Sequence, residues 1–191
     1  IVVSNGVGTT ISLTGDGAVL RGITVEGSGD RFDRSDAAVV VEGRDITVED
    51  VTVRSALFGI LSNKTTRATI RRNHVVGTGQ EAIGLRGDGI RLWETTASLV
   101  EANVVRDCRD VVVWYSSGNR IVDNDVRGCR YGTHFMYSHD ARVVGNRYED
   151  ITVGVFVMYS HGLELRGNLI ANAAGAAGIA LGFKDAGASK I

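Results

Sequence analysis

Two methionines and a histidine recur at positions where their side chains could bind a soft metal ion. Met136 and Met158 lie 22 residues apart, each begins the segment Met-Tyr-Ser, and His134 precedes Met136 by two residues. Thioether sulfur and imidazole nitrogen are ligands that suit Cu(I). We therefore predict a candidate Cu(I) site at Met136, Met158 and His134. The alternative for each residue is plain packing or surface exposure.

Two further pairs share the same spacing. His139 and His161 are 22 residues apart and follow the Met-Tyr-Ser segments, so they form a second candidate pair of copper ligands. Cys108 and Cys129 are 21 residues apart, a spacing that does not match a metal knuckle. We expect the cysteines on neighbouring coils as a stacked pair of buried thiols, with a disulfide as the alternative.

These spacings belong to a repeat that extends over much of the chain. The asparagines of the repeat are separated by 30, 21, 22 and 22 residues: Asn73, Asn103, Asn124, Asn146 and Asn168. Each lies fourteen residues after a member of a second series, Gly59, Gly89, Asp110, Gly132 and Gly154. Units of this length with three short apolar strands bury themselves only by stacking. We expect stacked asparagine amides at one corner, where their tolerance of left-handed backbone also helps.

The repeat predicts an all-β fold, a right-handed parallel β-helix of about 22 residues per coil and roughly 7–8 coils. We expect residues 1–191 to form a single domain, a fragment of a longer chain. The 25 glycines, the absence of proline and the many β-branched residues agree with short strands and tight turns. Two irregular stretches, 27–34 and 77–87, predict loops that either contribute to a binding face or are tolerated surface insertions.

Alternation within the strand after each glycine position predicts an unusual outward face. The residues expected to point outward are Arg91, Trp93, Val112, Trp114, His134, Met136, Phe156 and Met158. An apolar outer face of this kind is typical of docking surfaces. We predict partner docking through Trp93, Trp114, Met136, Phe156 and Met158, with cover by a terminal segment as the alternative. Tyr115, Tyr137 and Tyr159 each follow the last outward residue of a strand and so share one repeat position, here called the tyrosine slot, which we expect Phe183 to continue. We interpret these rings as internal packing.

The charged residues argue against several other functions. The net charge is −1, so no basic surplus indicates nucleic-acid binding, and no apolar run approaches the ~18 residues of a membrane span. Acidic residues such as Asp88, Asp107, Asp110, Asp123 and Asp125 are scattered, which favours a solvated charged face over a catalytic cluster. We expect that the protein is not an enzyme. A carbohydrate-binding or carbohydrate-active β-helix is the alternative, and a purely structural spacer is the third hypothesis.

Several segments together resemble one known family. They are Gly-Asp-Gly-Ile-Arg-Leu-Trp (87–93), Arg-Tyr-Gly-Thr-His-Phe-Met-Tyr-Ser-His-Asp (130–140), Val-Gly-Val-Phe-Val-Met-Tyr-Ser (153–160) and Gly-Ile-Ala-Leu-Gly-Phe-Lys-Asp (178–185). The chain is similar to NosD, the periplasmic β-helix subunit of the NosDFY ABC transporter. The paired Met-Tyr-Ser segments and the closing Gly-Phe-Lys-Asp region are the specific parts, whereas many β-helices share the repeat.

The resemblance implies a periplasmic accessory role in the maturation of nitrous oxide reductase. It implies copper delivery toward the copper–sulfur centre of that enzyme. The expected partners are the transporter subunits NosF and NosY, the copper chaperone NosL and the reductase itself. At the level of single residues, what the resemblance implies is limited to the segments Met136-Tyr137-Ser138 and Met158-Tyr159-Ser160.

Overall fold

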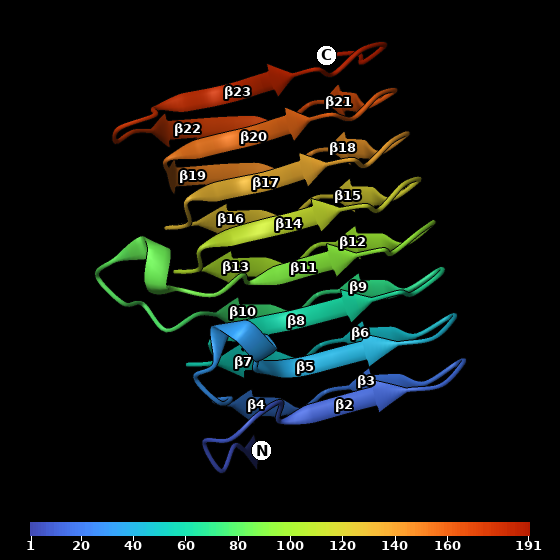
Figure 1. Ribbon diagram of the computed structural model, residues 1–191, viewed down its shortest axis with the longest axis vertical. Coiled ribbons are helices and arrows are strands. Elements are labelled where there is room, and N and C mark those ends of the chain that lie inside the picture. Colours follow the sequence, from blue (N-terminus) through green and yellow to red (C-terminus); the bar gives the residue numbers. More distant parts are fainter.

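The computed structural model describes residues 1–191 as a right-handed parallel β-helix of about eight turns with about 22 residues per turn. Figure 1 shows the coils stacked along one axis, with the N-terminus at one end and the C-terminus at the other. Every strand pairing is parallel, and each strand pairs with strands of the adjoining coils. The fold class predicted from the repeat is confirmed.

Three sheets run the length of the stack, here called sheets A, B and C. Sheet A contains β1 (Val2–Val3), β4 (Thr24–Glu26), β7 (Thr52–Arg54), β10 (His74–Val76), β13 (Val104–Arg106), β16 (Asp125–Arg127), β19 (Arg147–Ile151) and β22 (Leu169–Ala173). Sheet B contains β2 (Ile11–Thr14), β5 (Ala37–Glu42), β8 (Phe58–Asn63), β11 (Ile90–Trp93), β14 (Asp110–Trp114), β17 (Tyr131–Met136), β20 (Val153–Met158) and β23 (Ile179–Lys184). Sheet C contains β3 (Val19–Arg21), β6 (Thr47–Glu49), β9 (Thr69–Arg71), β12 (Leu99–Glu101), β15 (Arg120–Val122), β18 (Arg142–Val144) and β21 (Glu164–Arg166).

The inward residues of the three sheets form one continuous apolar core. In sheet B, Ile60, Ile90 and Val111 lie in register on successive coils and are almost fully buried. Burial of such side chains contributes about 1.5–3 kcal/mol each, which makes the inward columns the main source of stability. Coils approach too closely for a side chain at some corners. A Cβ on Gly132 would lie 2.5 Å from the carbonyl oxygen of Gly154, so glycine is required there.

The predicted asparagine ladder forms the corner between sheets C and A. The Oδ1 atom of Asn124 accepts hydrogen bonds from the backbone N–H and Nδ2 of Asn103, at 3.0 and 2.9 Å, and Asn146 does the same for Asn124. The left-handed residue of this corner is the one before each asparagine, for example Ala102 and Asp123 with φ of 52° and 54°. The predicted stacking is confirmed, but the expected left-handed asparagine is wrong, since Asn serves the corner through its amide.

Both irregular stretches form loops between sheets A and B, each with a short 3₁₀ turn, η1 (Phe32–Arg34) and η2 (Ile83–Leu85). Figure 1 shows both loops projecting on the same side of the solenoid. The first packs Phe32 edge-on against Phe58, at 5.3 Å between ring centroids. The second is held by Arg86, whose Nη1 donates to the carbonyl of Gly128 at 2.9 Å.

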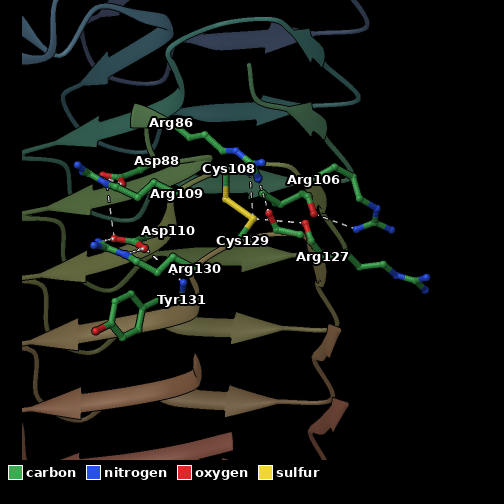
Figure 2. The surroundings of a disulfide bond; sticks show 12 residues. Arg86, Asp88, Arg106, Cys108, Arg109, Asp110, Arg127, Cys129, Arg130 and Tyr131 are labelled. Atoms are coloured by element: carbon green, nitrogen blue, oxygen red, sulfur yellow. Dashed lines mark hydrogen bonds and ion pairs between the residues drawn. A yellow bond between two sulfur atoms is a disulfide. The ribbon is translucent and has the colours of Figure 1, made fainter. Parts of the chain in front are cut away.

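The two cysteines form a disulfide, so the expected pair of free thiols is wrong. Cys108 and Cys129 occupy the same slot on adjacent coils, with their Cα atoms 4.8 Å apart and both side chains buried. That separation falls within the range that a disulfide spans, and both side chains point inward at the same corner, so they meet. Figure 2 shows the disulfide between Cys108 and Cys129, which links two adjacent coils.

Candidate functional site

The outward column of sheet B lies where alternation predicted it. Trp93 pairs in register with Trp114, Trp114 with Met136, and Met136 with Met158. All four side chains are half-buried. In the adjoining column Val112, His134 and Phe156 follow one another. The two columns therefore form one apolar face on the outside of four successive coils.

An irregularity at the start of β17 gives this face its central feature. The pairing of β14 with β17 shifts register between Asp110 and Val112, so one extra residue lies between Tyr131 and His134. Residues three apart in a regular strand point to opposite faces, but such a bulge brings them to the same face. The Tyr131 ring consequently stacks on the His134 ring at 4.7 Å between centroids. Sequence alternation did not indicate this contact.

His134 is enclosed on several sides and is only 9% exposed. The Trp114 ring meets its ring edge-on at 5.4 Å, and Phe156 lies 6.1 Å away on the next coil. The Nε2 atom lies 3.3 Å from the Sδ atom of Met158. The Nδ1 atom is buried and has no hydrogen-bond partner. A buried imidazole nitrogen without a partner is uncommon and requires a reason in the chemistry of the site.

The surroundings keep the His134 imidazole neutral. Burial lowers the pKa of His134 to about 4, and the positive charge of Arg130 adds to the effect. A metal ion binds the neutral imidazole, so His134 is competent as a ligand across the physiological pH range. The donor set of His134 and Met158, with Met136 next in the column, therefore fits Cu(I).

The second candidate pair has a different environment. The rings of His139 and His161 stack at 5.4 Å with an angle of 8°. The Nδ1 atom of His139 accepts the backbone N–H of His161 at 3.1 Å, and Nδ1 of His161 accepts that of Gly187 at 3.0 Å. Each neutral ring then carries its proton on Nε2. Copper binding by His139 and His161 stays a prediction. It would require these corner hydrogen bonds to break.

The tyrosine slot lies on the outside, so the interpretation as core is wrong. Tyr115 and Tyr137 are 46% and 44% exposed, and Tyr115, Tyr137 and Tyr159 stack at 5.3 and 5.0 Å. Their φ angles of 52°, 50° and 48° are left-handed, and this turn breaks the alternation after the outward Trp or Met. Phe183 does not continue the slot, because it pairs with Val157. Each tyrosine ring stacks on the next, and the Nζ atom of Lys184 lies 5.3 Å from the centroid of the Tyr159 ring.

Two of the acidic residues expected on a solvated face are buried instead. Asp88 and Asp110 are each 1% exposed, at the start of successive strands of sheet B and near the disulfide (Figure 2). Asp88 pairs with Arg91 at 2.6 Å and with Arg109 at 2.9 Å, and Asp110 pairs with Arg130. Burial raises the pKa of Asp88, and the two arginines oppose that shift. The sequence could not reveal this cluster because the partners come from different coils.

Other kinds of site were also sought in the structure. Nowhere do three or more histidine, cysteine, aspartate or glutamate side chains gather closely enough to hold a metal ion. None of the helical segments has the length and apolar character needed to cross a bilayer.

Fold and site together define a parallel β-helix protein whose outer face presents imidazole and thioether groups among aromatic side chains. The sequence pattern of one family, described as "Periplasmic copper-binding protein (NosD)", matches residues 78–187. Because this match covers more than half of the chain, the chain belongs to the NosD family of periplasmic copper-binding proteins.

A solved structure resembles the chain in fold. The A-module of the mannuronan C-5 epimerase AlgE6 from Azotobacter vinelandii aligns with a TM-score of 0.50 and 14% identity, over 90% of this chain and 61% of the module. The chain thus spans less than two thirds of that module. QnrB1, a plasmid-mediated fluoroquinolone resistance protein, aligns at 10% identity with a TM-score of 0.23, over 91% of this chain and 93% of its own. No curated protein matches the chain in sequence.

Proposed function

We propose that the chain binds Cu(I) at His134 and Met158, with Met136 as the third soft ligand. The contact that carries this proposal is the 3.3 Å approach of the His134 Nε2 atom to the Met158 Sδ atom. A neutral imidazole nitrogen beside a thioether is a donor set that prefers Cu(I) to harder ions. The enclosing rings of Trp114 and Tyr131 exclude water from His134.

We further propose a non-enzymatic role in copper delivery. The copper ligands lie within the apolar face of Trp93, Trp114, Met136, Phe156 and Met158, so a partner that docks on this face would contact the metal site directly. Likeness to NosD supports the copper–sulfur centre of nitrous oxide reductase as the destination. On this proposal the chain acts as docking scaffold of an ABC transporter, with NosF, NosY, NosL and the reductase as partners.

The test is an anaerobic titration with Cu(I) against a competing chelator, followed by native mass spectrometry. We expect one tightly bound Cu(I) in the parent protein. Met158→Leu keeps the volume of the side chain but removes the sulfur, and His134→Gln removes the imidazole. We expect each change to weaken Cu(I) binding by about tenfold or more. Loss of a residue that only hydrogen-bonds to a metal ligand already lowers metal affinity by about that factor.

The double variant His139→Gln with His161→Gln is the matched control. It also removes imidazole groups from stacked positions on the outside of the solenoid, but these belong to the corner ladder. We expect parental Cu(I) affinity in this control. Equal affinity in the parent, Met158→Leu and His134→Gln would show that the copper is bound elsewhere. Transfer of the bound Cu(I) to copper-free reductase, followed in the same samples, tests the delivery role.

A further inference from the structure

Sheet C carries a group of cations on its outer face, away from the apolar face of sheet B. Arg120 and Arg142 lie in register on neighbouring coils, followed by Glu164 and then Lys190. Val122, Val144 and Arg166 form the adjoining column. These two columns line a shallow hollow of about 350 Å³. A second hollow shares Arg142 and Glu164 with the first and extends to Lys190 and Asp140.

Most of these cations have no carboxylate partner. The one ion pair of the group joins Arg142 to Glu164 at 3.5 Å, and both side chains are well exposed, at 66% and 41%. Arg120, Arg166 and Lys190 form no ion pair. Like charges that face each other on neighbouring strands are destabilising, so the stacked Arg120 and Arg142 weaken the fold. Four cations thus face two carboxylates, Glu164 and Asp140.

The other end of the same sheet shows how such a group is satisfied within the chain. There Glu49 is 1% exposed and pairs with Arg21, with Arg71 at 2.6 Å and with Arg72 at 3.0 Å. The buried Glu49 carboxylate thus pairs with three guanidinium groups at once. Bidentate pairing between guanidinium and carboxylate is geometrically specific. Among Arg120, Arg142 and Arg166 the nearby carboxylate is the exposed Glu164, which pairs with Arg142 alone.

We propose that the outer face of sheet C between Arg120 and Lys190 binds an acidic segment of a partner protein. Its carboxylates would fill the role that Glu49 performs at the other end of the sheet. The exposed sides of Val122 and Val144 form an apolar floor, which suits a peptide better than a row of phosphates. This surface is separate from the copper site, so the two proposals stand independently.

The test is fluorescence anisotropy at low ionic strength with a labelled peptide of alternating Glu and Ser. A peptide of alternating Gln and Ser is the uncharged control. We expect the acidic peptide to bind the parent protein, and the Gln peptide not to bind. The triple variant Arg120→Gln, Arg142→Gln, Arg166→Gln should bind the acidic peptide about tenfold more weakly, as three exposed charge pairs together would predict.

A second triple variant separates a specific face from overall charge. The variant Arg34→Gln, Arg44→Gln, Arg54→Gln removes three other exposed arginines, none of which forms an ion pair, and it changes the net charge equally. We expect parental peptide binding in this variant. Equal losses in both triple variants, or equal binding of the two peptides, would overturn the proposal. So would binding to phosphatidylglycerol vesicles through Arg120, Arg142 and Arg166 without binding of the Glu peptide, because the ligand would then be a lipid headgroup.

Discussion

At the scale of single residues, His134 combines burial with a polar nitrogen that has no hydrogen-bond partner, which is unusual for a core residue. Its ring is buried among aromatic side chains, yet its Nδ1 atom has no hydrogen-bond partner and its Nε2 atom faces sulfur. A packing role alone would be served by Phe or Leu without an unsatisfied nitrogen. An imidazole at this position is what the proposed copper site requires, because the proposal places Cu(I) at the Nε2 atom beside the sulfur of Met158.

The low pKa of His134 leads to a prediction about pH. In the metal-free protein we expect the His134 ring signals to titrate with a midpoint of about pH 4 by NMR. The folded pKa is below the unfolded value of about 6.5, so the unfolded state binds more protons between these pH values. Stability should therefore fall as pH falls from about 6.5 toward 4, by on the order of 2 kcal/mol from this group.

His134→Gln provides the comparison for that prediction. Urea unfolding at pH 7 and pH 4.5 should show a smaller loss of stability in the variant than in the parent, because the variant lacks the group that must become charged. Identical losses, together with an NMR midpoint near the ordinary value of about 6.5, would contradict the burial of this imidazole.

Residue positions that follow strict periodicity were predictable from the sequence, and positions at irregularities were not. The column from Trp93 to Met158 follows from alternation and a constant repeat length. The outward position of Tyr115 depends on a left-handed turn, and the contact of Tyr131 with His134 depends on a bulge. The left-handed turn carries tyrosine instead of glycine, and Gly132 inside the bulge belongs to the glycine series of the repeat, so neither irregularity is marked in the sequence.

At the scale of elements, the asparagine ladder connects coils through both side chain and backbone. Asn124 accepts two hydrogen bonds from Asn103 and donates to Asn146 and to the carbonyl of Val100, all at 2.9–3.0 Å. A buried position of this kind leaves several polar groups unsatisfied when the amide is removed. The ladder therefore sets the register that brings the outer columns into line.

We expect Asn124→Ala to lower the free energy of unfolding by about 3 kcal/mol or more, measured by urea denaturation. The matched control is Asn5→Ala, because the Asn5 side chain is exposed and accepts one local hydrogen bond, from Val7 at 3.1 Å. We expect a change below about 1 kcal/mol there. Similar losses in the two variants would mean that the ladder is not a main support of the corner.

The ladder could be predicted from sequence, whereas the ion pairs of the sheet corners could not. The asparagines repeat with the coil, so their stacking follows from the period alone. Asp88 pairs with Arg91, three residues further along the chain, and with Arg109 from the next coil, and Asp110 pairs with Arg130 one coil further on. Such a cluster depends on side-chain reach in three dimensions, which a repeat length does not specify.

At the scale of the whole molecule, each coil contacts mainly the coil before it and the coil after it. Stability in such a solenoid is approximately a sum over coils and their interfaces. One complete repeat should therefore be removable without loss of the fold. Residues 147–168 form such a repeat, since Arg147 pairs in register with Leu169 and Asn146 with Asn168.

We expect deletion of residues 147–168 to leave a folded β-helix with a β-rich circular dichroism spectrum and cooperative unfolding. The urea m value should fall by about an eighth, in proportion to the surface lost. Deletion of residues 147–157 removes half a coil and should prevent folding, because inward and outward residues no longer coincide between coils. A folded half-coil deletion would contradict the dependence of the fold on register.

Deletion of residues 147–168 also changes the proposed copper site, because it removes Met158. In the shortened chain the strand that now follows β17 is β23, so Lys184 takes the place of Met158 in the outward column. An ammonium group cannot replace a thioether as a ligand for Cu(I). We therefore expect the shortened protein to fold and to lose high-affinity Cu(I) binding in the chelator titration. A folded deletion variant that retains parental Cu(I) affinity would place the copper site outside the column that coil stacking creates.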